Sequence, residues 1–120
     1  MQRQHHNLIV WQQGIALVKL VYRLTAKFPS AEAFGLTGQM RRAAVSVPAN
    51  IAEAVGRAGP KERLHFLGIA RGSLNELDTY VVIAKELGYL GDAKDLQTLT
   101  DRVFGLIGGL INAERRTSAA

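Results

Sequence analysis

The sequence predicts an all-α fold, an antiparallel up-down four-helix bundle formed by residues 1–120 as a single domain. Apolar residues recur every three or four positions in four long segments, which is the period of a helix with a buried face. Short stretches that contain glycine or proline separate these segments, and short connections make neighbouring helices antiparallel. No segment alternates strictly between apolar and polar residues, as a half-buried strand does.

The first helix is expected from Leu8 to about Lys27. It carries two apolar stripes, Leu8, Trp11, Ile15, Val18 and Tyr22 on one side and Leu17, Val21, Leu24 and Phe28 on another. A helix that is apolar over more than half of its circumference must bury more than one face. This surplus fits either a well-covered internal helix or a helix that meets another subunit. Gly14 costs about 1 kcal/mol against alanine in a helix, so we expect another helix to approach closely there.

The second helix is expected from Leu36 to Val55, after a loop in which Phe34 folds back onto the core. Its apolar period continues on both sides of Pro48. A proline inside a helix removes one backbone hydrogen bond and clashes with the carbonyl group four residues back. We therefore expect the second helix to be kinked at Pro48 and not to end there. Gly56 is expected to cap this helix in the left-handed conformation.

The third helix is expected from Pro60, a residue type that suits the first turn, to about Leu87. Gly88 follows and is predicted to end the helix as a glycine cap. Gly68 and Gly72 lie four residues apart, a spacing that suggests close packing against another helix.

The fourth helix is expected to begin at Asp92, an N-cap residue type, and to continue to about Glu114. Its three glycines lower its helix propensity, so its stability depends on tertiary contacts. Residues 1–7 and 115–120 are predicted to be flexible tails.

The net charge of +5 is unevenly distributed along the sequence. Residues 1–60 contain seven Lys and Arg residues against two acidic ones, whereas residues 61–120 contain eight of each sign. A basic surface makes an acidic partner such as RNA or DNA plausible. The candidate nucleic-acid-binding residues are Arg41, Arg57, Lys61, Arg63 and Arg71. The alternative is a solvated basic surface, and exposed aromatic residues that would stack single strands are not interleaved with these cations.

Polar residues share one face of the second helix, at steps of four, four and three from Arg42 to Glu53. We interpret them as a structural network in which Arg42 pairs with Glu53 or with Glu76 of the third helix, an arrangement that sets register. The predicted network consists of Gln39, Arg42, Ser46, Asn50, Glu53, Ser73 and Glu76. The alternative is a polar pocket or a catalytic site, but no nearby histidine or second carboxylate completes an acid–base set.

Several kinds of site find no support in the sequence. The chain has no cysteine, which excludes disulfides and thiolate metal sites. Glu62 and His65 form one Glu-x-x-His pair, whereas di-iron bundles need two, and His5-His6 has no carboxylate beside it. We predict no metal, no cofactor, no small-molecule substrate and no enzymatic activity. The N-terminus lacks a signal-peptide pattern, and no stretch approaches the roughly 20 apolar residues of a membrane span, so we expect a soluble cytoplasmic protein.

Two runs, LTGQMRRAAVSVPANIAEAVGR (36–57) and GSLNELDTYVVIAKELGYL (72–90), resemble the four helix bundle proteins of the 23S rRNA-intervening sequence protein family. Members were first noticed as reading frames within bacterial large-subunit ribosomal RNA genes. The residues that match the family motif are Gln39, Arg41, Arg42, Ser46, Pro48, Asn50, Glu53, Arg57, Ser73 and Glu76. One departure is Ala54, where the family commonly has glycine after Asn-Ile-Ala-Glu.

The resemblance extends from Leu8 through the fourth helix, and it implies a bacterial protein that closes into a cyclic homopentamer. The chain is also similar to the accessory protein of diversity-generating retroelements, a basic pentamer that binds nucleic acid and partners a reverse transcriptase. Two hypotheses on function follow. The first is a non-enzymatic ring that binds nucleic acid through a basic surface. The second is a purely structural or protein-recruiting oligomer without nucleic-acid binding.

Overall fold

The computed structural model describes residues 3–119, with Ala119 described by its backbone alone, and over this range it contains helices and no strands. The four long helices are α1 (Ile9–Thr25), α2 (Leu36–Val55), α3 (Pro60–Glu86) and α4 (Lys94–Ala119). Two short 3-10 helices, η1 (Gln4–Asn7) and η2 (Ser30–Glu32), precede α1 and α2. The all-α, four-helix prediction is confirmed.

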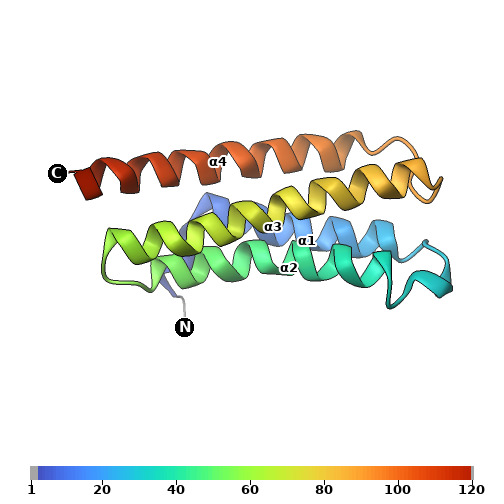
Figure 1. Cartoon of the computed structure of the whole chain (residues 1–120), viewed down its shortest axis with the longest axis horizontal. Coiled ribbons are helices and arrows are strands. Elements are labelled where there is room, and N and C mark those ends of the chain that lie inside the picture. Colours follow the sequence, from blue (N-terminus) through green and yellow to red (C-terminus); the bar gives the residue numbers. More distant parts are fainter. Residues whose placement is uncertain (1–2, 120) are drawn as a thin grey trace.

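The helices lie side by side along the longest dimension of the molecule, and successive helices run in opposite directions (Figure 1). Each helix packs against two neighbours, so that α1 contacts α2 and α4, and α3 contacts α2 and α4. One apolar core fills the space between them. Its fully buried large side chains are Leu17, Met40, Ile51, Leu74, Leu77, Leu96, Ile107, Val21, Val47 and Val103.

Helix α1 buries one of its two apolar stripes and leaves the other partly open. Leu17 and Val21 are fully buried in the core. On the other stripe, Ile15 remains 36% exposed and Tyr22 42% exposed. The bundle therefore does not cover all the apolar surface that α1 presents.

Close approach at Gly14 is confirmed. A Cβ atom at this position would stand 3.2 Å from the Cβ atom of Pro48, which is itself buried in α2. The same expectation is wrong for Gly68 and Gly72, because a Cβ atom at either would meet nothing within 4 Å. These two glycines lie on the exposed side of α3.

Helix α2 continues through Pro48, and the kink there stays a prediction.

The two helix ends at glycine differ from each other. Helix α2 ends at Val55 as predicted, but Gly56 has a φ of −75°, so the left-handed cap proposed there is wrong. At the end of α3, Gly88 does adopt the left-handed conformation, with a φ of +78°. There the backbone N–H of Tyr89 donates to the carbonyl of Ala84 at 2.9 Å, which is the bond that defines a Schellman cap.

Both ends of the chain are more helical than predicted. Helix α4 begins at Lys94, two residues after Asp92, and continues to Ala119 through most of the predicted C-terminal tail. Within the predicted N-terminal tail, η1 packs against α1 and α2. The His5 and His6 rings lie 5.2 and 5.0 Å from the Trp11 ring, and these contacts hold η1 in place. Residues 1–2 and 120 of the predicted tails lie outside the described residues.

The side chain of Phe34 is 98% exposed. The expectation that it folds back onto the core is therefore wrong. The Glu32 carboxylate takes the inner position of this loop instead, and its Oε1 accepts the backbone N–H of Leu36 at 3.0 Å.

None of the four helices, over the residues that the structure describes, has the run of apolar residues that crossing a lipid bilayer requires.

Candidate functional site

A small hydrogen-bonded cluster joins α2 to α3. The hydroxyl groups of Ser46 and Ser73 share a hydrogen bond of 2.8 Å between the two helices. Asn50 donates from Nδ2 to the carbonyl of Ser46 at 2.8 Å and to its Oγ at 2.9 Å. Three of the predicted network residues therefore meet. Because their polar groups satisfy one another, the arrangement is that of a structural tie between helices.

The other predicted network residues do not join this cluster. Arg42 and Glu53 share a face of α2, but eleven residues of helix separate them by about 16 Å, which is beyond side-chain reach. Glu53 instead accepts a hydrogen bond from Arg57 at 2.9 Å, and Glu76 accepts one from Tyr80 at 3.3 Å. Gln39 and Arg42 are exposed and make no side-chain hydrogen bond within the described part of the chain. The proposed ion pair of Arg42 with either glutamate is thus not formed.

Two of the five candidate nucleic-acid-binding residues come together at the turn between α2 and α3. Arg57 and Lys61 line a hollow of about 550 Å³, together with Glu62, His65 and Phe66. The guanidinium group of Arg57 lies 4.6 Å above the centre of the Phe66 ring. Its ion pair with Glu53 is solvent-exposed, and an exposed pair of this kind contributes little and leaves the cation available.

Arg63 has a structural role. Its Nε donates to Glu114 Oε1 at 2.7 Å, and its Nη1 donates to the carbonyl groups of Arg57 and Ala58 at 3.1 and 2.9 Å. The hydrogen bond to Glu114 raises the pKa of the Arg63 guanidinium, while burial opposes this rise and the charge of Glu114 supports it. Arg63 thus clamps the C-terminal part of α4 to the α2–α3 turn, and its Nε and Nη1 groups are already engaged there.

The last two candidates lie elsewhere. Arg41 sits near the start of α2, sixteen residues or about 24 Å of helix from Arg57. There its Nε donates to Thr25 Oγ1 at 2.9 Å, and its guanidinium lies 4.4 Å over the Tyr22 ring. Arg71 is half-buried on α3, about two turns beyond Arg63. The five residues therefore do not form one patch.

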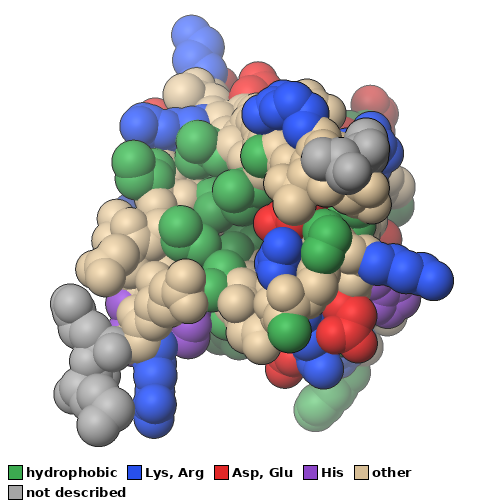
Figure 2. Space-filling model, turned by 90° about the vertical axis from the view of Figure 1, so that its left-hand side faces the viewer, with side chains coloured by type: hydrophobic (Ala, Val, Ile, Leu, Met, Phe, Trp, Pro, Cys, Tyr) green, Lys and Arg blue, Asp and Glu red, His purple; other side chains and the backbone are tan. Residues whose placement is uncertain are grey.

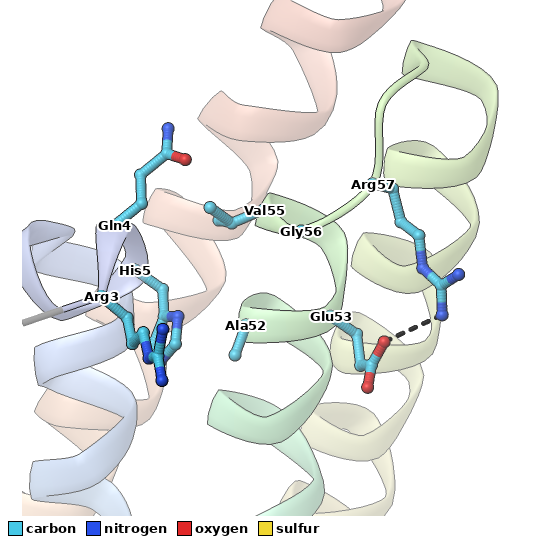
Figure 3. Close-up of a pocket in the computed structure, with 8 residues that line it drawn as sticks. All are labelled: Arg3, Gln4, His5, Ala52, Glu53, Val55, Gly56 and Arg57. Carbon is cyan, nitrogen blue, oxygen red and sulfur yellow. Dashed lines mark hydrogen bonds and ion pairs between the residues drawn. The ribbon is translucent and has the colours of Figure 1, made fainter.

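The fold brings Arg3, which was not among the candidates predicted from the sequence, close to Arg57. Because η1 folds back onto α1 and α2, Arg3 and His5 line a second hollow of about 430 Å³ with Glu53 and Arg57 (Figure 3). The helical period of the sequence contains no signal for this docking. Only the two histidines ahead of Trp11 hint at an aromatic contact.

The C-terminal turns of α4 lie at the same end of the bundle as η1 and the α2–α3 turn (Figure 1). Seen from this end, apolar side chains occupy the centre, and Lys and Arg side chains lie around them with Asp and Glu side chains in between (Figure 2). We define the basic end as Arg3, Arg57, Lys61, Arg115 and Arg116. Arg57 lines two hollows, one with Arg3 and the other with Lys61, and cations grouped in this way are suited to bind a phosphate group or another anion.

A metal-binding cluster is not evident in the described range. No group of three or more histidine, aspartate and glutamate side chains gathers there as metal ligands. Glu62 and His65 do line one hollow, but Arg57 and Lys61 share it, and their positive charges oppose the binding of a metal cation.

Comparison with known proteins adds one finding. No curated protein matches the chain. A family model described as 23S rRNA-intervening sequence protein matches residues 6–109, from η1 to the middle of α4. The match includes the Ser46–Asn50–Ser73 cluster, and it confirms the resemblance seen in the sequence. With this match over most of its length and a four-helix fold, the chain belongs to the family of 23S rRNA-intervening sequence proteins.

Proposed function

We propose that the protein is a non-enzymatic, self-associating scaffold whose basic end binds the phosphate backbone of RNA or DNA. The ring of five copies implied by the family resemblance is the assembly we propose, and a cytoplasmic location is part of the proposal. The role of the family is uncertain, so the support comes from the surface of this chain.

Uncovered apolar side chains support self-association. Ile15 and Tyr22 on α1 and Val45 on α2 are each at least 36% exposed, although the core of the bundle is complete without them. Phe34 is almost fully exposed. Tyr22, Phe34 and Val45 line one hollow. An apolar patch of this kind marks an interaction site, because covering it removes apolar area from water, which contributes about 25 cal/mol per Å².

The observation that carries the nucleic-acid proposal is the meeting of Arg57 and Lys61 in one hollow beside Arg3. Contacts to phosphate from such cations give affinity without sequence preference. In a ring, each copy presents the same basic end, and several weak contacts on one strand reinforce one another through effective concentration.

Fluorescence anisotropy with short labelled RNA and DNA strands, at about 50 and 200 mM salt, tests the proposal. We expect binding that weakens as salt rises. The variant Arg57→Gln/Lys61→Gln should bind at least about tenfold more weakly and lower the slope of log K against log salt by about 1 to 2. Arg71→Gln/Arg102→Gln removes the same charge elsewhere and should stay within about twofold. No salt-dependent binding at micromolar protein, or an equal loss in the control, contradicts the proposal.

The second candidate is a structural or protein-recruiting oligomer that binds no nucleic acid. It is favoured by two ion pairs within the chain, Arg57 with Glu53 at 2.9 Å and Arg63 with Glu114 at 2.7 Å. In these pairs the arginine charges are already matched by carboxylates. An oligomer that shows no salt-dependent binding in the anisotropy titration would establish this candidate over the first.

A further inference from the structure

Phe34 is an exposed aromatic side chain on a loop that is firmly held. Both carboxylate oxygens of Glu32 accept hydrogen bonds that hold the loop. Oε1 accepts the backbone N–H of Leu36 and Oε2 accepts the hydroxyl of Tyr89, each at 3.0 Å. A Cβ atom at Gly35 would come within 2.6 Å of Glu32 Oε1, so a larger residue there would push this carboxylate out of its present position. The loop is therefore built to present Phe34 outward.

The surface around Phe34 is both apolar and basic. A hollow of about 660 Å³ lies over the outer face of α2, and no carboxylate lines it. Its lining residues are Tyr22, Ala33, Phe34, Gly38, Arg41, Arg42, Val45 and Ser46. The Arg42 guanidinium lies beside Gly38, with its Nη1 3.5 Å from where a Cβ atom of residue 38 would stand. A partner for this surface needs an apolar recess with acidic residues at its rim.

The same chain carries such a recess between α1 and the start of α4. It has a volume of about 260 Å³ and an apolar floor, with two aspartates and one lysine at its rim. Its lining residues are Leu20, Leu24, Asp92, Ala93, Lys94, Asp95 and Leu96. The α1–α2 loop that bears Phe34 and the start of α4 lie at the same end of the bundle (Figure 1).

The two surfaces lie on opposite sides of α1. Leu20 and Leu24 are each two residues from Tyr22, and residues two apart on a helix point about 200° away from each other. A surface and its complement on opposite sides of one molecule give a head-to-tail contact that repeats from copy to copy, and such a contact forms a ring where the rotation between copies closes. Because both surfaces are at one end, the bundles would stand side by side in that ring.

We propose that Phe34 of one copy inserts into the recess between α1 and α4 of the next copy, with Arg42 opposite Asp92 and Asp95. This inference rests on the self-association proposed above and names the contact that produces it. Phe34 is the apolar anchor of the contact, and the charges select its partner and its register.

Cross-linking tests this contact directly, because the natural chain contains no cysteine. A chain with Ala33→Cys and Lys94→Cys keeps Phe34 and the leucines of the recess, and each new cysteine borders one of the two surfaces. Treated with a short bismaleimide, it should give a ladder of covalent species that extends beyond the dimer. The control pairs Ala33→Cys with Leu87→Cys, since Leu87 is 54% exposed near the same end but follows directly after α3. The control should stay monomeric on a denaturing gel.

Two sets of variants complete the test. Phe34→Ala should weaken association by about tenfold or more, and Leu87→Ala by less than about twofold. Arg42→Glu and Asp92→Arg should each weaken association, and their combination should restore it. An oligomer in light scattering that gives no ladder refutes this contact and leaves self-association standing. A monomeric parent chain refutes both.

Discussion

Replacing Gly14 by alanine tests the contact between α1 and α2. Alanine gains about 1 kcal/mol over glycine inside a helix. At this position, however, the new Cβ atom would lie 3.2 Å from Pro48 Cβ, closer than the roughly 3.5–4.0 Å at which two carbon atoms attract best. Pro48 is buried inside α2, and its ring is bonded to the backbone, so it can move away only together with the helix. We expect the steric cost to cancel the gain, and Gly14→Val to lose about 2 kcal/mol of stability.

Gly105→Ala in α4 is the matched control, because a Cβ atom there meets nothing within 4 Å. It should stabilise the protein by about 1 kcal/mol and raise the melting temperature by about 4 °C in a chain of this size. Circular dichroism measures the free energy of unfolding in a urea titration and the melting temperature in a thermal scan, each at one protein concentration because association changes apparent stability. If Gly14→Ala stabilises as much as Gly105→Ala, the close contact with Pro48 does not exist.

Two further predictions concern the ties between elements. Ser46→Ala and Ser73→Ala should show a coupling free energy of about 1 kcal/mol in a double-mutant cycle of urea unfolding, and additive losses would mean that their hydrogen bond contributes nothing. The hydrogen bond from Tyr89 to Glu32, with burial and the charge of Glu32 acting in the same direction, raises the pKa of the Tyr89 phenol above its usual value. The stability from this bond is therefore complete below about pH 10 and is lost as pH rises through the raised pKa. Tyr89→Phe should remove that part of the alkaline loss of stability, and an unchanged pH profile in the variant would contradict this assignment.

The helices were predictable because their apolar period is local. The start of α3 at Pro60 follows from a residue type that acts within one turn of helix. The end of α2 at Val55 was predicted as well, although Gly56 does not adopt the left-handed conformation expected of it. The position of Phe34 was not predictable in this way. Whether an aromatic residue in a loop turns inward depends on what already fills the inner position, and here Glu32 fills it.

The candidate site was predictable only in its short-range part. Steps of four along α2 place Ser46 and Asn50 together, and the antiparallel α3 brings Ser73 to them. Arg63 resembles any other cation in the sequence, because its partner Glu114 is 51 residues away. The docking of η1, which adds Arg3 to the basic end, likewise depends on tertiary contacts that no local pattern records.

The central claim is that one bundle leaves apolar surface uncovered and that further copies of the chain cover it. Molar mass from light scattering on a size-exclusion column, at micromolar concentration, tests this claim most directly. We predict a stable species of five times the 13.1 kDa of one chain, and a shift toward the single-chain mass in Ile15→Lys/Tyr22→Glu. A natural chain that remains at 13.1 kDa at micromolar concentration and above would contradict the account.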